Sequence, residues 1–210
     1  MRQGKFEEAL NIQRTTYSKC VKIYGEKDLE CLKQMVSLGY TEARFDLNKG
    51  KQILEKFFTI EPKDNLYFLR TRVNARGNLS NIYLELGDIK KSEELALEAV
   101  NLVDPTDTRF RDTYITAMSD YYITVVRRGG VKESIEGYKE LLNLIEEIKG
   151  PLYFGSRLTL LNNLAYCYSM TGDKKKALEI YLEAEEFSKQ QTQARATNTI
   201  RGNIADIYYT

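Results

Sequence analysis

The residues that could carry out chemistry in this chain are few, and histidine is not among them. Without histidine there is no Ser-His-Asp or Cys-His arrangement, no histidine metal ligand and no general base of the commonest kind. The three cysteines, Cys20, Cys31 and Cys167, are odd in number and share no metal-type spacing, so we expect reduced thiols and no metal site. Cys167 lies within a helical pattern, which predicts a small buried thiol in place of a nucleophile. We therefore predict a protein that is not an enzyme and has no catalytic residue, metal or cofactor.

Other reactive-looking groups have simpler interpretations. The pair Gly129-Gly130 lacks a phosphate-loop pattern and is typical of a turn that ends a helix, while Glu93-Glu94 is typical of a solvated helix face. The run Lys174–Lys176 is too isolated to argue for nucleic acid. The formal net charge is +1, and no apolar run approaches the roughly 20 residues of a transmembrane helix. We expect a cytoplasmic protein that binds neither nucleic acid directly nor a membrane.

The elements that would position these residues repeat along the chain. Residues 78–92 align without gaps with residues 163–177, and residues 37–57 and 121–141 carry weaker copies. The chain opens with the second half of the unit and closes with the first half. Leu, Glu, Lys and Ala are plentiful and prolines number only 3, so each half-unit is predicted to be a helix. The period of about forty residues places turns at positions 4, 48, 87, 129 and 172.

Each predicted turn separates two helical patterns. Leu161, Leu164, Ala165 and Tyr168 follow the spacing i, i+3, i+4, i+7, which places them on one helical face. A turn glycine can take the left-handed conformation that ends one helix, and the aspartate that follows it can cap the next helix. Asn48, at the weakest turn, tolerates that conformation better than most residues.

Small residues are expected where paired helices touch, as in Ser80 with Ser92 and Ala165 with Ala177. A larger side chain there would force the helices apart at a cost of about 1–3 kcal/mol. Neither helix of a pair can bury its apolar face alone, so neighbouring pairs must stack.

The repeated unit resembles the tetratricopeptide repeat, whose signature is met most fully by Leu164-Ala165, Tyr168, Gly172, Ala177, Tyr181 and Ala184. The tryptophan of that family is absent, and Arg76, Met118, Leu161 and Arg201 stand in its place. The resemblance implies an all-α fold, a right-handed α-solenoid of antiparallel helix pairs with about ten helices. The long period is similar to that of kinesin light chains, bacterial peptide-pheromone sensors and repeat arms fused to caspase-like proteases.

We expect one repeat array over residues 1–210, cut inside a repeat at both ends, as a fragment of a longer protein would be. The expected divisions are a half repeat 1–27, repeats 28–63, 64–105, 106–150 and 151–192, and a half repeat 193–210.

The resemblance also implies a binding groove along the first helix of each pair. Its positions hold an asparagine in three copies, Asn78, Asn163 and Asn203, and an amide can pair with an extended peptide backbone without demanding a sequence. The alternative is that each of these asparagines caps or bridges adjacent helices through backbone carbonyls. The carboxylate clamp of some relatives is not matched, because its lysine position holds Gly77 and other residues without charge. The candidate peptide-binding residues are Asn74, Asn78, Asn81, Ser119, Asp120, Ile123, Asn162, Asn163, Tyr166, Asn203 and Asp206.

Three hypotheses remain open at this point. The first is a non-catalytic scaffold, a protein–protein interaction module that binds a peptide or helix of another protein in the groove. The second is the sensory or regulatory arm of a larger signalling protein, whose output domain lies outside these residues. The third is end-to-end self-association through the open ends of the array.

Overall fold

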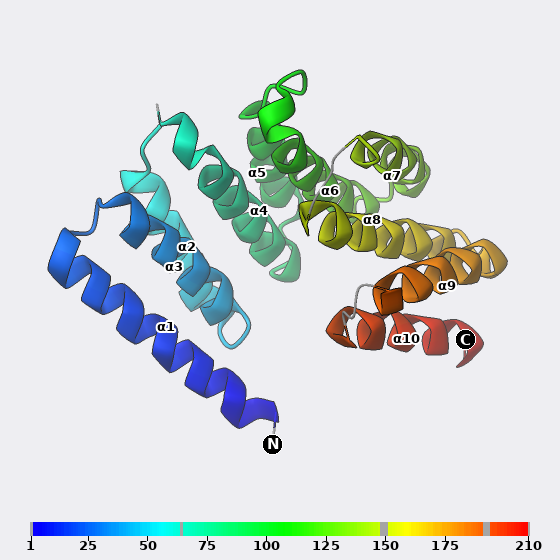
Figure 1. Ribbon diagram of the computed structural model, residues 1–210, viewed down its shortest axis with the longest axis horizontal. Coiled ribbons are helices and arrows are strands. Elements are labelled where there is room, and N and C mark those ends of the chain that lie inside the picture. The colour runs from blue at the N-terminus through cyan, green and yellow to red at the C-terminus, as the bar shows by residue number, and fades with distance from the viewer. Residues whose placement is uncertain (1, 64, 148–150, 191–193, 210) are drawn as a thin grey trace. The chain divides into compact units, whose positions relative to one another are not determined.

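The computed structural model describes residues 2–63, 65–147, 151–190 and 194–209. Within these ranges the chain forms ten α-helices and two short 3-10 helices, and no strand (Figure 1). The all-α prediction is therefore confirmed. None of the described helices combines the length and the apolar character needed to cross a membrane.

The helices group into two compact units, Met1–Val103 and Asp104–Thr210. The first unit contains, in chain order, α1 (Arg2–Tyr24), α2 (Leu29–Ala43), α3 (Leu47–Ile60), the 3-10 helix η1 (Leu66–Phe68), α4 (Leu69–Glu85) and α5 (Ile89–Asn101). The second unit contains η2 (Thr108–Phe110), α6 (Arg111–Arg127), α7 (Val131–Ile145), α8 (Pro151–Met170), α9 (Lys174–Gln190) and α10 (Ala194–Tyr209). Each of the four full repeats expected from the sequence holds one pair of successive helices.

In three of these pairs the turn between the two helices contains a glycine with a positive φ angle. Gly87, Gly129 and Gly172 have φ angles of 86°, 99° and 82°, in the left-handed region that glycine adopts without strain. The side chain of Asp88 accepts a hydrogen bond from the backbone N–H of Lys91 at 3.0 Å and so caps α5. The predicted turns at positions 87, 129 and 172 are confirmed.

The other two predicted turns are wrong. Gly4 lies inside α1, and Asn48 lies in the first turn of α3. The α2–α3 turn ends at Asp46, whose side chain accepts hydrogen bonds from the backbone N–H groups of Asn48 and Lys49 at 3.0 and 3.2 Å. A side-chain cap at Asp46 thus starts the helix that the repeat pattern placed after Asn48.

Small residues do lie where paired helices touch. Ser80 and Ser92 are buried, and the Ser80 hydroxyl lies 2.8 Å from both the hydroxyl and the carbonyl oxygen of Ser92. Gly50 extends this pattern, because a Cβ atom there would lie only 2.5 Å from the Cβ of Ala43. The backbones of α2 and α3 therefore approach more closely than any side chain at position 50 would permit.

Arg76, at the family's tryptophan position, is buried in the first unit. Its guanidinium donates two hydrogen bonds to the carboxylate of Glu61, at 2.8 and 2.9 Å, and lies 4.8 Å from the ring centroid of Phe58. Burial alone would lower the pKa of Arg76, but the hydrogen bonds and charges of Glu61 and Glu98 together raise it, so the guanidinium keeps its charge. A charged pair thus fills the space that an aromatic ring occupies in the family signature.

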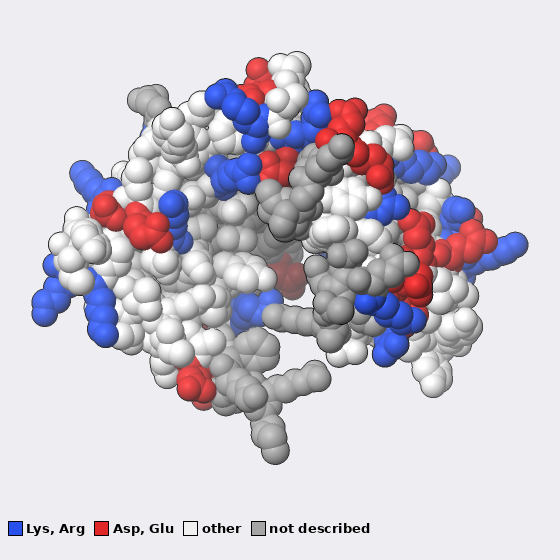
Figure 2. Space-filling view, viewed as in Figure 1, with Lys and Arg blue, Asp and Glu red and all other residues white. Residues whose placement is uncertain are grey.

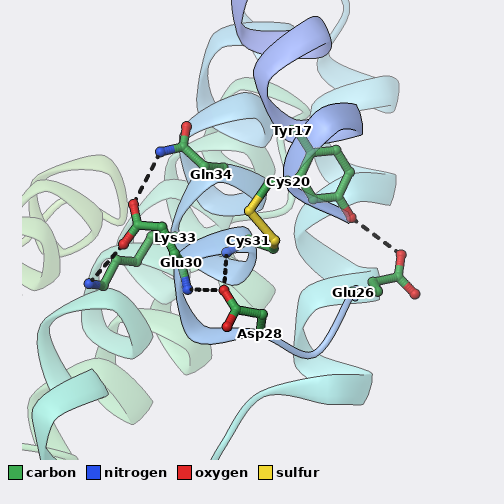
Figure 3. Close-up of a disulfide and its surroundings, with 8 residues drawn as sticks. All are labelled: Tyr17, Cys20, Glu26, Asp28, Glu30, Cys31, Lys33 and Gln34. Atoms are coloured by element: carbon green, nitrogen blue, oxygen red, sulfur yellow. Dashed lines mark hydrogen bonds and ion pairs between the residues drawn. A yellow bond between two sulfur atoms is a disulfide. The ribbon is translucent and has the colours of Figure 1, made fainter. Parts of the chain in front are cut away.

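A disulfide joins α1 to the start of α2. Cys20 and Cys31 are bonded Sγ to Sγ, and the bond lies next to Asp28, the residue that caps α2 (Figure 3). The expectation of three reduced thiols is therefore wrong for Cys20 and Cys31. The chain between these two residues, which are 11 apart in sequence, reverses at the α1–α2 turn and so brings the two sulfurs together. Cys167 is a free buried thiol, as predicted, and burial raises its pKa to about 11.

Candidate functional site

In the first unit, the first helices of two successive pairs, α2 and α4, lie side by side and leave two adjoining hollows between them (Figure 1). Their volumes are about 310 and 270 Å³, and both are lined by Tyr40 and Asn78. We call them together the α2/α4 hollow. Its other lining residues are Lys33, Val36, Ser37, Ala43, Arg44 and Leu47 on the α2 side and Thr71, Asn74, Asn81, Ile82 and Glu85 on α4.

Three of the predicted residues project into this hollow from α4. Asn74, Asn78 and Asn81 follow the spacing i, i+4, i+7 and so share one helical face. Asn74 is exposed and the other two are half-buried, and no side-chain hydrogen bond joins any of them to another described residue. Each amide therefore keeps two donors and an acceptor for a ligand.

The opposite wall of the hollow comes from α2 and carries positive charge. Lys33 lies at one end, 3.3 Å from the carboxylate of Glu30, and Arg44 lies at the other. The Arg44 guanidinium donates a hydrogen bond to the Tyr40 hydroxyl at 3.3 Å. Tyr40 is half exposed, so its ring offers an apolar surface between the two basic ends.

In the second unit, α6 and α8 are likewise adjacent and enclose a cleft of about 280 Å³, which we call the α6/α8 cleft. Two predicted residues, Ser119 and Asp120, line it from α6. The remaining lining residues are Ile115 and Thr116 on α6 and Gly155, Ser156, Thr159 and Leu160 on α8. Burial raises the pKa of the Asp120 carboxyl to about 7.

The asparagines of the second unit are used within the fold. Asn203 on α10 donates to the side-chain oxygen of Asn162 on α8 at 2.7 Å. The Asn162 amide nitrogen donates to the side-chain oxygen of Asn163 at 3.4 Å, and the Asn163 amide nitrogen donates to the hydroxyl of Ser119 on α6 at 3.4 Å. A chain of side-chain hydrogen bonds thus braces α6, α8 and α10. Asn163 and Asn203 thus bridge helices in the described structure, but through side-chain atoms and not through the backbone carbonyls that the alternative named.

The last three predicted residues lie outside both sites. Ile123 on α6 is half-buried, while Tyr166 on α8 and Asp206 on α10 are exposed, and none of them is among the lining residues given above. The predicted set is therefore divided by the structure: three residues gather at the α2/α4 hollow, two at the α6/α8 cleft and three in the bracing chain.

Sequence reasoning missed the whole α2 wall. Lys33, Ser37 and Tyr40 come from the weakest repeat copy, where no gap-free alignment fixed the groove positions. Ser156 was also missed, because it lies one turn before the groove positions carried over to α8. For the α2 wall, the helical period of residues 29–43 was the available signal, since it places Lys33, Ser37 and Tyr40 on one face.

Charge on the drawn surface is mixed in sign. Basic and acidic side chains lie interspersed on the face shown in Figure 2, in keeping with 31 basic and 30 acidic residues in the sequence. Specific local groups, more than a general field, therefore distinguish the two sites.

Comparison with known proteins agrees with this architecture. A family model described as tetratricopeptide repeat matches residues 73–102 and 158–191. No curated protein sequence matches the chain. Among solved structures, nearly identical TPR-like repeats from Podosopora anserina, named for kinesin light chain, share 16% identity over 92% of this chain and 91% of that one, with a TM-score of 0.61.

Two bacterial structures have the same fold. BtubC (BKLC) from P. vanneervenii is 14% identical over 91% of this chain and 76% of that one, with a TM-score of 0.65. PlcR of Bacillus thuringiensis, solved in complex with the peptide PapR7 and DNA, is 12% identical over 95% of this chain and 74% of that one, with a TM-score of 0.69. At these identities the likeness concerns the fold alone.

The helical fold and the repeated helix pairs place this chain in the class of TPR-like α-solenoids. Residues 73–102 and 158–191 match the tetratricopeptide repeat, and the helix pairs have the fold of the TPR-like repeats named for kinesin light chain.

Proposed function

We propose that this chain is a non-catalytic interaction module that holds an extended peptide segment of another protein in the α2/α4 hollow. The observation that carries the proposal is the row of Asn74, Asn78 and Asn81, whose amides face the hollow without a side-chain partner among the described residues. A protein scaffold of this repeat type is typical of protein–protein interaction.

The chemistry of the row suits a peptide backbone. A side-chain amide donates to a peptide carbonyl and accepts from a peptide N–H, so three amides at one-turn spacing can hold an extended chain without reading its side chains. The exposed Tyr40 ring opposite them offers an apolar contact, and Lys33 offers a positive charge at one end. We therefore expect tolerance of sequence, with preference for a peptide that places an apolar residue against Tyr40.

A test begins with peptides selected from a displayed random 12-residue library on the whole chain. Fluorescence anisotropy of a selected peptide should show binding at least about tenfold weaker for Asn74→Ala/Asn78→Ala/Asn81→Ala, because each lost hydrogen bond contributes roughly 0.5–1.5 kcal/mol. The melting temperature should not fall, since these side-chain amides make no hydrogen bond to any residue that the structure describes.

The matched control is Asn163→Ala/Asn203→Ala, which removes equivalent residues of the second unit. It should lower the melting temperature, because both side chains brace helices, and leave peptide affinity within twofold. Equal affinity of the α4 variant and the unmodified chain would contradict the proposed groove.

A regulatory role is the second candidate, and the likeness to PlcR, which was solved with a bound peptide and DNA, favours it. In that case peptide binding would act on an output domain outside these 210 residues. Adding the selected peptide to the full-length parent protein should then change the output activity, and an unchanged output would remove this candidate.

Three expectations stay proposals. The division into a half repeat, four repeats and a second half repeat is one, and end-to-end self-association is another. The third is a cytoplasmic location, whose basis in reduced thiols is weakened by the Cys20–Cys31 disulfide, a bond that is rare in cytosolic proteins.

A further inference from the structure

The α6/α8 cleft differs from the α2/α4 hollow in the charge of one repeat position. The groove position that holds Asn78, Asn163 and Asn203 in three copies holds Asp120 in the fourth. The cleft therefore has a carboxylate where the other copies have an amide. A carboxylate that is ionised only accepts hydrogen bonds, so this copy lacks the donors that let an amide pair with its neighbours.

Asp120 has no counter-ion in the described part of the chain. No hydrogen bond or ion pair joins its carboxylate to any of those residues, and it is the only ionisable side chain that lines the cleft. Its neighbours are neutral: Tyr138 on α7 and Cys167 on α8 are buried, and burial raises the pKa of each.

Several basic side chains of the neighbouring elements are paired elsewhere. Arg157, the only basic residue of α8, forms ion pairs with Glu146 and Glu183. Arg111 at the start of α6 pairs with Glu147, and the nearby 3-10 helix η2 directs its arginine to an aspartate of its own turn. Arg109, Arg111 and Arg157 thus lie near α6 or α8, but their guanidinium groups pair with other carboxylates and not with Asp120.

Two of the four hydroxyl groups that line the cleft present acceptors. Thr116 donates its hydroxyl hydrogen to the carbonyl of Asp112 at 3.0 Å, and Thr159 donates its own to the carbonyl of Gly155 at 3.0 Å. With their hydrogens used, both oxygens face the cleft as acceptors only. Ile115 and Leu160 complete the lining with apolar surface. The Asp120 carboxylate and these two oxygens favour a ligand that brings N–H donors and a positive charge, and the apolar lining favours an aliphatic stem.

We propose that the α6/α8 cleft binds a primary ammonium group, carried by a lysine side chain of a partner, with Asp120 as its counter-ion. The ammonium has three donors, which match the Asp120 carboxylate and the oxygens of Thr116 and Thr159, while the four-carbon stem packs on Ile115 and Leu160. The cleft volume of about 280 Å³ suffices for one such side chain. This site does not depend on peptide binding in the α2/α4 hollow.

The titration of Asp120 gives the site a pH signature. With a pKa of about 7, the carboxyl is mostly protonated at pH 6 and mostly ionised at pH 8. Because the ammonium binds the ionised form, affinity should rise about tenfold between pH 6 and pH 8.

The test is a chemical-shift titration of the ¹⁵N-labelled whole chain with Nα-acetyl-lysine N-methylamide, whose only charge is the side-chain ammonium. Saturating shifts should centre on the amides of Ser119, Asp120 and Thr159. Nα-acetyl-norleucine N-methylamide has the same stem without nitrogen, and norleucine N-methylamide carries its ammonium at the chain terminus. Both should bind at least tenfold more weakly than the lysine probe.

Two variants then identify the groups. Asp120→Asn, which restores the amide of the other copies, should weaken the lysine probe at least tenfold and abolish its pH dependence, while Thr159→Val should weaken it severalfold. The matched control is Glu140→Gln on α7, an exposed acidic residue that does not line the cleft, and it should change affinity less than twofold. Spectra of the two variants that match the unmodified chain away from the cleft establish that both fold.

Three results would overturn the proposal: equal binding of the lysine and norleucine probes, equal binding by Asp120→Asn, or no saturating shift at the cleft. Tighter binding of the terminal amine than of the lysine probe would overturn the lysine assignment. Loss of peptide binding in the α2/α4 hollow bears on neither probe, so the two proposals fail independently.

Discussion

The buried pair of Glu61 and Arg76 offers the sharpest test of how the first unit is held together. We consider Glu61→Gln, which keeps the shape of the side chain and removes its charge. In the native chain the Glu61 and Arg76 side chains are only 3% and 10% exposed, so water can solvate neither charge well. The substitution would leave the Arg76 guanidinium buried with a neutral neighbour.

The magnitude follows from this burial. Removing one partner of a buried ion pair typically costs about 3–5 kcal/mol, because the remaining charge is left uncompensated. Two features of the site moderate the loss. The Arg76 charge also lies 3.4 Å from the carboxylate of Glu98, and it stacks over the Phe58 ring. We therefore expect the lower end of the range, about 3 kcal/mol.

The assay is urea unfolding followed by circular dichroism, with hydrogen exchange of the α4 amides to assign the change to the first unit. The control is Glu98→Gln, which removes the other carboxylate beside Arg76. Glu98 is 54% exposed, and an exposed pair contributes typically less than about 1 kcal/mol. If Glu61→Gln and Glu98→Gln change the free energy of unfolding equally, burial does not set the strength of this pair and the reasoning is refuted.

Three further predictions concern other elements. Cys20→Ala should lower the unfolding free energy by about 3 kcal/mol, the entropic value for closing a loop of this length with Cys31, and the difference should vanish under reducing conditions. Gly50→Ala should destabilise by about 2 kcal/mol in urea unfolding although alanine favours helix, because the new Cβ would meet the backbone of Ala43 at 2.7 Å. Asp120→Asn should stabilise the chain relative to the native protein at pH 8 but not at pH 4. A raised carboxyl pKa contributes stability that is complete below pH 4 and lost as pH rises through about 7, by up to about 4 kcal/mol in melts across that range.

Controls for these predictions come from the same repeats. Gly155→Ala places its Cβ where no atom lies within 4 Å, so it should stabilise by about 0.5–1 kcal/mol and show that Gly50 acts through contact. Glu140→Gln should leave the pH dependence of stability unchanged. A destabilised Gly155→Ala, or a Glu140→Gln that reproduces the Asp120→Asn profile, would contradict the assignments.

The sequence was sufficient for the parts of the fold that depend on local rules. The turns at Gly87, Gly129 and Gly172 were predictable because a left-handed residue between two amphipathic patterns is strongly selective for glycine. The turn at Gly25, with a φ of 89°, was missed, because the first helix lacks the repeat signature that would have set its register. Asn48 was misplaced since the cap at Asp46 decides where α3 begins.

The candidate site was predictable only where the repeat register was clear. Repeat equivalence placed Asn74, Asn78 and Asn81 on one face of α4, and the structure finds them lining one hollow. What each amide contacts depends on the neighbouring helix, which the register does not specify. The distance of 2.7 Å between Asn203 and Asn162 therefore had to come from the structure.

The same repeat position thus makes different contacts in different copies, depending on the side chains of the neighbouring helix. Asn163 donates to the Ser119 hydroxyl and Asn203 donates to the Asn162 side-chain oxygen, so the amides of those copies brace helices. Asn78 finds no such partner across the α2/α4 hollow, which leaves a neutral amide for a peptide backbone. At position 120 a carboxylate replaces the amide and lies among acceptor oxygens. Burial raises the pKa of this carboxyl, and a bound cation would favour its ionised form. The two proposed binding positions, Asn78 and Asp120, are therefore the ones at which the bracing pattern is interrupted.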